Sequence, residues 1–438
     1  MSAAVVGLPN GRTVPPSRVA PPSRVVPPSR VVPVDIVGCS VLSPAGSGLA
    51  ALADALANVQ GPAAEDKAGG ASAVGEAAGG LPPLAVRPVA DFDPAAVLGS
   101  KGLSRLTRTD RLAMSACTTA LAEAGAGAAP ERTGVVLGTA LGSSGAQSAF
   151  LRDTFVQDLP YLVNPSAFPG TLMNSAAGKT AIKHGLTGVN ATVSGGPPAA
   201  LHALRYARTA LTDGRAARLL AGGVEEVSQQ SALAWRLSGA LRPGTPLAEG
   251  CAVFALQLAG QDVESAPESY AAPGPGSDAD PSTHGDSYGD SYEEAAGRRR
   301  PLGRLLACET GYADPFQDVL GVSRRLASCV RTALARSGLA PEDVAVVATG
   351  AGGRRGWAAV EERALRGVFP APGAPAAPRR LRVDQALGET YGASAALQLA
   401  AVLAHWQDPA TPARGDRVAV LTSVGMDGCV GCLVVVRP

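Results

Sequence analysis

The sequence has few of the features that mark a secreted, membrane-embedded or nucleic-acid-binding protein. Aromatic residues make up 4% of it, there are four histidines, and the formal net charge at pH 7 is +1. Because positive and negative charges are nearly equal in number, there is no electrostatic reason to expect DNA, RNA or anionic lipid as a partner. No apolar run approaches the roughly 20 residues of a membrane-spanning helix, and the N-terminus lacks the charged-then-apolar order of a secretory signal. We therefore expect a cytoplasmic protein with no membrane or nucleic-acid partner.

The seven cysteines are odd in number and scattered along the chain, which argues against a disulfide framework. Each lies in an apolar segment, the usual environment of a reduced and buried thiol. Cys429 and Cys432 have CxxC spacing, but no second pair of ligands accompanies them. Because both stand inside the apolar run GCVGCLVVV, we expect them to pack in a strand, and we expect neither a metal ion nor a cofactor.

Two stretches of biased composition divide the chain. Residues 1–33 repeat a Pro-Pro-Ser-Arg unit, and paired prolines favour an extended backbone without donors. Residues 261–301 are rich in Gly, Pro, Ser and Asp, and they have too few aliphatic side chains to bury a core. We expect a disordered arm and a disordered acidic insert. The alternatives are a proline-motif ligand in the arm and a metal site around His284 in the insert.

Between these stretches, short apolar runs alternate with segments of helical period. Unbroken runs of Val, Leu and Ile are typical of strands that are covered on both faces. Such runs occur at 34–42, 133–141, 189–194, 218–227, 251–258, 344–351, 417–424 and 432–436. Segments 110–125 and 319–338 have the apolar spacing of one helical face. The alternation of strands and helices predicts a layered α/β domain.

The same turn residues recur in the same order in two parts of the chain. Gly125 ends the first of these helices, and Ala-Pro-Glu at 129–131 leads into a strand. Gly338 ends the second helix, and Ala-Pro-Glu at 340–342 again leads into a strand. Glycine ends helices readily because it adopts the left-handed conformation. The repeat predicts two related halves, 34–260 and 302–438.

The stretch TVSGGPPAAL at 192–201 has the pattern of a sharp strand-to-helix bend, where several enzyme families place a nucleophile. The crest here carries Gly195, Gly196, Pro197 and Pro198, none of which can attack a substrate. Proline suits the first helical turn because its φ is already close to the helical value. We predict that the bend is retained for the fold and not for chemistry.

Several segments together resemble the β-ketoacyl-acyl-carrier-protein synthases of the thiolase fold. They occur in the family's order: VDIVGCSVLSPAGSG, DFDPAAVLGSKGLSRLTRTDRLAMSA, VNPSAFPGTLMNSAAGKTAIKHGLTGVNATVS, AGGVEE, LAEGCAVFAL, LGETYGASAALQ and TSVGMDGCVGCLVVV. The resemblance covers all of the chain except the arm and the insert. It implies an α/β, thiolase-like fold with αβαβα layers and two duplicated halves.

Condensing members of this family use a cysteine at the bend and two histidines, and the sequence departs from the pattern at each position. Pro197 holds the place of the cysteine, and Thr349 that of the histidine in a motif like HGTGT. In a motif like KSxxGHxxGA, Asp384 replaces the lysine and Glu389 replaces the second histidine. These replacements imply that no catalytic residue remains, and Asp384 and Glu389 would add negative charge to a site that normally handles malonate.

The resemblance thus implies a chain-length-factor-like subunit that pairs with an active synthase and helps to shape the acyl tunnel in polyketide, polyene or fatty-acid biosynthesis. Acyl carrier protein is expected to bind through that partner. In this family, subunits dimerise through the strand before the bend, and segment 149–174 resembles the region that lines the tunnel. The tunnel or interface candidates, for which ordinary core packing is the alternative, are Phe150, Tyr161, Phe168, Met173 and Met426.

Two other functions remain open. An acyltransferase or condensing enzyme with rebuilt chemistry could use Ser194, Thr349 or Glu389, although an ionised carboxylate cannot donate a hydrogen bond to an oxyanion. A homodimeric scaffold that binds acyl carrier protein needs no synthase. Residues that match no catalytic position are expected on surfaces or in packing, namely His184, His202, His405, Lys179 and Arg205.

Overall fold

The computed structural model describes residues 31–60, 72–74, 84–90, 92–125, 129–260, 300–408, 411 and 416–438. All of them belong to one compact unit, Val31–Pro438. The arm expected at 1–33 lies outside the described residues apart from its last three, and so does the insert expected at 261–301 apart from its last two. Within the described ranges, no helix is both long and apolar enough to cross a membrane.

The long strands of each half follow the same spatial order. Those of the first half are β1 (Val34–Ser43), β5 (Thr133–Thr139), β6 (Asn190–Ser194), β7 (Arg218–Glu225) and β9 (Gly250–Leu258). Those of the second half are β10 (Gly303–Tyr312), β11 (Val346–Thr349), β12 (Arg379–Arg382), β13 (Val418–Val424) and β14 (Cys429–Val436). The sheet runs β12-β11-β13-β14-β10-β1-β9-β7-β5-β6. We number the strands of each half in chain order and follow the sheet from each edge toward its centre. Both halves then have the order third, second, fourth, fifth, first, so the expected duplication is confirmed.

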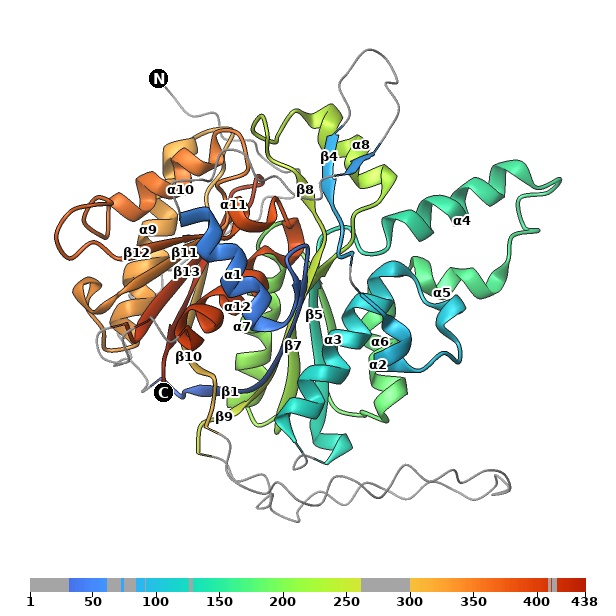
Figure 1. Cartoon of the computed structure of the whole chain (residues 1–438), viewed down its shortest axis with the longest axis horizontal. Coiled ribbons are helices and arrows are strands. Elements are labelled where there is room, and N and C mark those ends of the chain that lie inside the picture. Colours follow the sequence, from blue (N-terminus) through green and yellow to red (C-terminus); the bar gives the residue numbers. More distant parts are fainter. Residues whose placement is uncertain are drawn as a thin grey trace, which may run out of the picture. The chain divides into compact units, whose positions relative to one another are not determined.

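The helices follow the same division (Figure 1). The first half contains α1 (Gly48–Gln60), α2 (Pro94–Leu98), α3 (Arg108–Ala124), α4 (Ser144–Val156), α5 (Phe168–Thr171), α6 (Ser175–His184), α7 (Ala199–Thr212) and α8 (Gln229–Ser238). The second contains α9 (Val319–Arg336), α10 (Trp357–Arg366), α11 (Val383–Leu387) and α12 (Ser394–Gln407).

Short elements complete the described chain. Strand β2 (Gly46–Ser47) pairs with β1, and a small sheet has the order β3 (Ser72–Val74), β4 (Leu84–Arg87), β8 (Leu247–Ala248). The 3-10 turns are η2 (Leu103–Arg105), η3 (Pro130–Arg132), η4 (Pro165–Ala167), η5 (Pro341–Asp343) and η6 (Tyr391–Ala393).

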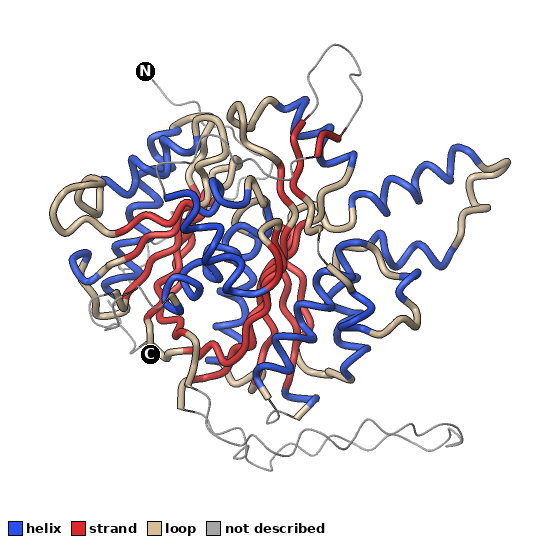
Figure 2. The backbone as a smooth tube through the Cα atoms, in the orientation of Figure 1, coloured by secondary structure: helices blue, strands red, loops and turns tan. Residues whose placement is uncertain are grey.

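Alternate residues along each strand enter different cores, which explains why the strands read as unbroken apolar runs. On β5, Val136 joins a central core with α7 and α12, whereas Val135 packs with α3 and α6 on the other face. On β13, Leu421 joins the same central core, whereas Val420 packs with α9 and α10. Helices α7 and α12 therefore lie between the two groups of strands, and the layers are αβαβα as expected for a thiolase-like fold (Figure 2).

The repeated turn residues occupy equivalent places in the two halves. Gly125 and Gly338, with φ of +70° and +69°, follow α3 and α9. Pro130 and Pro341 then open the turns η3 and η5, which lead into β5 and β11. Both helices are followed by glycine because the chain leaves each helix with a positive φ, in the left-handed region. In both halves a helix, a glycine, an Ala-Pro-Glu turn and a strand follow in the predicted order, but the glycine lies five residues before the proline in the first half and three residues before it in the second.

Two of the long strands did not appear among the expected elements. Strand β12 consists of Arg379, Arg380, Leu381 and Arg382, and its single deeply buried side chain is Leu381. It ends the sheet, and charged residues are common on edge strands because they discourage pairing with other chains. Strand β10 joins the two halves by pairing with both β1 and β14, and its burial is irregular toward its C-terminal end. Neither strand has the apolar pattern used to find the others.

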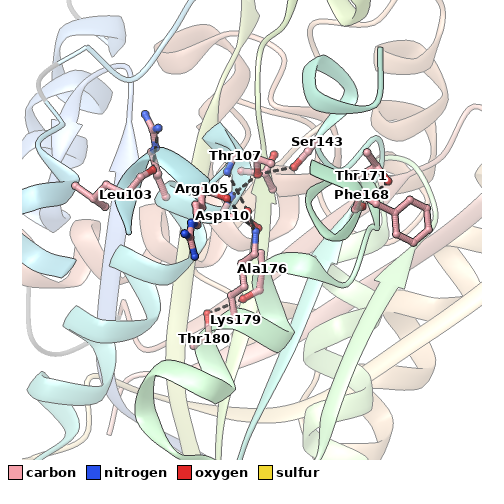
Figure 3. A network of polar contacts seen from close by, with 12 residues as sticks. Leu103, Arg105, Thr107, Asp110, Ser143, Phe168, Thr171, Ala176, Lys179 and Thr180 are labelled. Atoms are coloured by element: carbon pink, nitrogen blue, oxygen red, sulfur yellow. Dashed lines mark hydrogen bonds and ion pairs between the residues drawn. The ribbon is translucent and has the colours of Figure 1, made fainter. Parts of the chain in front are cut away.

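Figure 3 shows a polar network that joins the beginning of α3 to α6 and to the residue before α4. Lys179 Nζ lies 2.6 Å from Asp110 Oδ2, and the Asp110 side chain is fully buried. Asp110 Oδ2 also accepts a hydrogen bond from the Thr107 backbone N–H at 3.0 Å. Thr107 Oγ1 lies 2.8 Å from Ser143 Oγ. The expectation that Lys179 lies on a solvated face is wrong, because it is the counterion of this buried carboxylate.

We predict that Lys179→Met lowers the free energy of unfolding by about 3 kcal/mol, because the Asp110 carboxylate is left buried without a cation. Chemical denaturation monitored by circular dichroism measures this change. The double variant Asp110→Asn/Lys179→Met should recover part of the loss, since the unpaired charge is gone. Lys101→Met, at an exposed position, is the control. Equal stability of the Lys179 and Lys101 variants would contradict the prediction.

Candidate functional site

The bend between β6 and α7 is built by two glycines and two prolines. Gly196 has φ of +59°, in the left-handed region that favours glycine. The Ala199 N–H donates to the Gly196 carbonyl at 3.1 Å, and the His202 N–H donates to the Pro198 carbonyl at 2.9 Å. Pro197 and Pro198 are both buried. The predicted bend is therefore present, and its crest supplies neither a thiol nor the N–H groups that a catalytic cysteine would use.

Glu389, at the place of the second histidine, forms an ion pair with Arg354 in the interior. Arg354 Nε lies 3.2 Å from Glu389 Oε2, and each side chain is 1% exposed. The guanidinium also donates to the carbonyl oxygens of Val424 at 2.6 Å and Gly350 at 3.1 Å. Glu389 Oε1 accepts a hydrogen bond from the Tyr391 N–H at 2.9 Å. This pair thus connects the loop after β11 to the end of β13 and to the segment before α12.

The sequence predicts that Glu389 adds negative charge to the site, and in the structure Arg354 lies beside it as a counterion. Reasoning from the sequence did not single out Arg354. A signal for it is present, since the loop that resembles the family's HGTGT motif reads TGAGGRRG and carries two arginines at 354 and 355. An arginine inside a glycine-rich loop can reach a buried carboxylate, because its long side chain has five donors.

Asp384 and Glu361 add two further carboxyl groups around the same loop. The Asp384 carboxyl lies against the backbone of Gly352, where an added Cβ would overlap with it. Glu361 is buried and accepts hydrogen bonds from the Ala351 N–H at 2.9 Å and from Thr422 Oγ1 at 2.7 Å. Burial raises the pKa of Asp384 to about 7, and the charges of Glu389 and Glu361 act in the same direction. Burial raises the pKa of Glu361 as well.

Contacts bring the four replaced positions into one neighbourhood. Thr349 ends β11 and is half-buried, and the carbonyl of the next residue, Gly350, is held by Arg354. Arg354 in turn binds Glu389, whose charge acts on Asp384. Two residues after Glu389, the Tyr391 hydroxyl lies 3.6 Å from the place that a Cβ on Gly196 would take, directly before Pro197. The alignment made from sequence motifs therefore corresponds to a spatial cluster.

Three other candidate nucleophiles or bases have hydrogen-bond partners away from the replaced positions. Ser194 ends β6, and its hydroxyl donates to the Ala140 carbonyl at 3.4 Å. His184 Nε2 lies 2.8 Å from Thr118 Oγ1, and His405 Nε2 lies 3.0 Å from Asp416 Oδ2. Burial lowers the pKa of His202.

The cysteines are free thiols, and burial raises the pKa of Cys117 and Cys308 to about 12. Cys429 and Cys432 lie on β14 as expected, with Cys432 buried. Within the described ranges, no group of three His, Cys, Asp or Glu side chains could hold a metal ion.

The tunnel or interface candidates fall into two places. Helix α4 and the loop after it project away from the sheet (Figure 1), and the rings of Phe150 and Phe168 meet there at 5.9 Å between centroids. Tyr161 is 73% and Phe168 50% exposed, so core packing is wrong for these two. Met173 is half-buried beside Gly142. Met426 lies elsewhere, in a small apolar cluster that includes Trp235 and Tyr391.

The projecting segment carries an apolar surface. Phe155 is 85% exposed, and the other exposed apolar side chains of this segment are Leu151, Val156, Leu159, Tyr161, Leu162, Phe168 and Leu172. Soluble monomers rarely expose so many large apolar side chains in one segment. Strand β6, which precedes the bend, is the last strand of the sheet, and none of the described residues pairs with its outer side. Both features favour an interface with another chain.

The chain belongs to the β-ketoacyl synthase family, because the family model "Beta-ketoacyl synthase, N-terminal domain" matches residues 32–258. Two curated relatives, from Coxiella burnetii (strain RSA 493 / Nine Mile phase I) and Vibrio harveyi, both bear the name 3-oxoacyl-[acyl-carrier-protein] synthase 2. They are 28% and 29% identical to it over 143 residues, which is 32% of this chain. The chain thus matches about a third, 34%, of the length of either relative.

Solved structures resemble the whole chain. The ishigamide ketosynthase/chain length factor is 31% identical, covers 92% of this chain and 99% of its own, and has a TM-score of 0.69. A type II polyketide acyl-carrier protein in complex with its ketosynthase (TM-score 0.69) and a β-ketoacyl synthase from Burkholderia phymatum STM815 (TM-score 0.68) are each 18% identical, with 93% of this chain and 100% of theirs covered. At that identity the last two show the fold alone. The chain is thus a ketosynthase-family member of the chain-length-factor-like kind.

We predict that Asp384→Asn stabilises the protein more at pH 8 than at pH 5. The pKa of Asp384 is raised to about 7 by burial and neighbouring charge. The folded chain therefore binds this proton more tightly than the unfolded chain, and the contribution to stability is complete below pH about 4 and is lost as the pH rises through 7. Between pH 5 and pH 8 the variant should gain on the order of 2 kcal/mol relative to the wild type.

Denaturant titrations at the two pH values measure this gain. Glu342→Gln, which removes an exposed carboxylate, should show no pH-dependent difference from the wild type. A constant difference between Asp384→Asn and the wild type at both pH values would contradict the prediction.

Proposed function

We propose that this chain is a non-catalytic, chain-length-factor-like subunit that pairs with an active β-ketoacyl-acyl-carrier-protein synthase. The observation that carries the proposal is the Arg354–Glu389 ion pair, which stands where the family's second histidine would act. The bend offers Pro197 in place of the nucleophile. One of these changes could accompany another mechanism, but both together leave neither an acyl acceptor nor a neutral donor for an oxyanion.

The electrostatics of the site support the same conclusion. Decarboxylation of a malonyl group develops negative charge, which donors in the site must stabilise. Arg354 faces Glu389 and donates to two backbone carbonyls. Asp384 and Glu361 contribute further carboxyl groups beside the loop. A site arranged in this way disfavours malonate, so we infer that condensation takes place on the partner.

The partner surface consists of strand β6 together with the apolar segment of α4, α5 and the loop between them. An obligate interface is more apolar than ordinary surface, and this segment exposes eight large apolar side chains. One similar structure is described as a ketosynthase/chain length factor and another as an acyl-carrier protein in complex with its ketosynthase. These descriptions support a synthase as the direct partner and acyl carrier protein as a partner of the complex.

We further propose that this surface helps to bound the acyl tunnel. Phe150 and Phe168 pack together, and Tyr161 and Met173 lie on the same projecting segment. When a synthase covers the segment, these side chains become buried beside its bound acyl chain. Their size would then limit how far that chain can grow.

We predict that co-expression with a synthase that has an intact cysteine and both histidines yields a one-to-one complex. Phe155→Asp should weaken that complex at least about tenfold, because a charge is placed in an apolar contact. Phe316→Asp is the matched control, since Phe316 is 93% exposed but lies in the loop before α9. Size-exclusion chromatography and light scattering measure the association. A stable homodimer that ignores the synthase would favour the scaffold alternative and refute the pairing.

We also predict that Pro197→Cys does not restore condensation, because Thr349, Asp384 and Glu389 still occupy the positions that would assist it. The assay supplies acyl and malonyl carrier protein to the purified variant and follows the product by mass spectrometry. The wild-type chain should remain free of covalently bound acyl groups in the same assay. An acyl adduct on the wild type would instead support an enzyme with rebuilt chemistry, with Ser194 as the first residue to test.

A further inference from the structure

Tyr391 has an unusual backbone conformation. Its φ is +44°, and among the described residues Ala376, with φ of +61°, is the only other non-glycine residue with positive φ. For a bulky residue this region costs about 1–3 kcal/mol, and it persists only where the surroundings enforce it. Ala376 lies in an exposed loop, whereas Tyr391 is half-buried and packs against the cluster around Trp235. Some feature of the site therefore holds Tyr391 in place.

Two buried carboxyl groups hold the backbone on either side of this tyrosine. The Tyr391 N–H donates to Glu389 Oε1 at 2.9 Å, and the Gly392 N–H donates to Glu225 Oε2 at 3.1 Å. Glu225 is itself anchored, since it accepts from the backbone N–H groups of Ala140 at 2.7 Å and Leu141 at 2.9 Å. A Cβ at Gly392 would overlap with Glu225, so the next residue must be glycine. The strained conformation is thus fixed from both halves of the chain.

The conformation directs the aromatic ring into the space beside the bend. The ring meets Trp235 edge-on, with centroids 5.0 Å apart and planes at 88°. It belongs to a cluster with Met426 and Leu247. On its other side, Cζ and Oη lie 3.9 and 3.6 Å from the place of a Cβ on Gly196. The side chain therefore fills the gap between the Trp235 cluster and the crest of the bend.

We propose that Tyr391 is a specificity-determining plug, whose ring closes the bend of this subunit to acyl chains. The inference rests on the proposed function, in which acyl chains belong to the partner's bend and not to this one. An apolar wall of Trp235, Met426 and Leu247 would suit a straight acyl chain if the ring were absent. Loss of the nucleophile removes the site at which an acyl chain would be covalently attached, and the Tyr391 ring removes the space that the chain would occupy.

The test compares three variants of the full chain with the wild type. Tyr391→Gly removes the ring and also relieves the backbone strain, because glycine adopts positive φ without cost. Tyr391→Phe keeps the ring and removes the hydroxyl. Ala376→Gly relieves strain at the other positive-φ position without opening space, which makes it the matched control.

Crystals of each protein are exposed to xenon, which enters dry apolar cavities. We expect a xenon atom between Gly196 and Trp235 in Tyr391→Gly alone. In solution, calorimetry with octanoyl-pantetheine should show binding about tenfold tighter to Tyr391→Gly than to the wild type, because several methylene groups gain a buried site. Tyr391→Phe and Ala376→Gly should match the wild type.

Xenon beside Gly196 in the wild type, or octanoyl-pantetheine bound equally by wild type and Tyr391→Gly, would overturn the plug. The wild-type and Tyr391→Phe crystals decide the question even if Tyr391→Gly does not fold, since a xenon atom beside an intact ring shows that the ring does not fill the space. Failure of the proposed function would be seen separately, as the absence of a complex with a synthase. Neither xenon uptake nor octanoyl-pantetheine binding depends on that complex.

Discussion

The buried ion pair between Arg354 and Glu389 is the interaction on which the site depends. Taking two charges out of water is costly, and further hydrogen bonds to each group offset part of that cost. Here those bonds come from the carbonyls of Gly350 and Val424 and from the Tyr391 N–H. Both charged groups therefore hold neighbouring backbone segments in place, and neither is free to transfer a proton. A position that could serve proton transfer now fastens three loops together.

Much of the fold could be predicted from the sequence, because its signals are local. Apolar runs found the buried strands, and the repeated Gly and Ala-Pro-Glu residues found the duplication. The edge strand β12 was missed since three of its four residues are arginines, and the joining strand β10 was missed since its burial is irregular. The resemblance to the family supplied the four replaced positions. It could not show the partner of Glu389 or the positive φ of Tyr391, because both arise from contacts between distant segments.

The projecting segment shows where sequence reasoning stops for a different reason. Phe150, Tyr161, Phe168 and Met173 are apolar in either a core or an interface, and their spacing does not tell one from the other. Exposure separates the two cases, since Tyr161, in the turn after α4, and Phe168, at the start of α5, are both exposed. An apolar surface of this kind is costly in a lone chain. The stability of the segment therefore depends on whether a partner chain covers it.

Strand register places the start of β1 and the bend at opposite ends of the sheet. Gly250, at the start of β9, pairs with Glu225 near the bend, whereas Leu258, at the end of β9, pairs with Val34. Nine residues of strand separate these points by about 27 Å. The Ala259 N–H binds the Pro33 carbonyl, and Arg304 pairs with Val436, so the described residues that border 1–30 and 261–299, and the end of β14, lie at the far end of the sheet. Affinity tags, fluorophores or tethers fused at any of these junctions would leave the bend and β6 unobstructed.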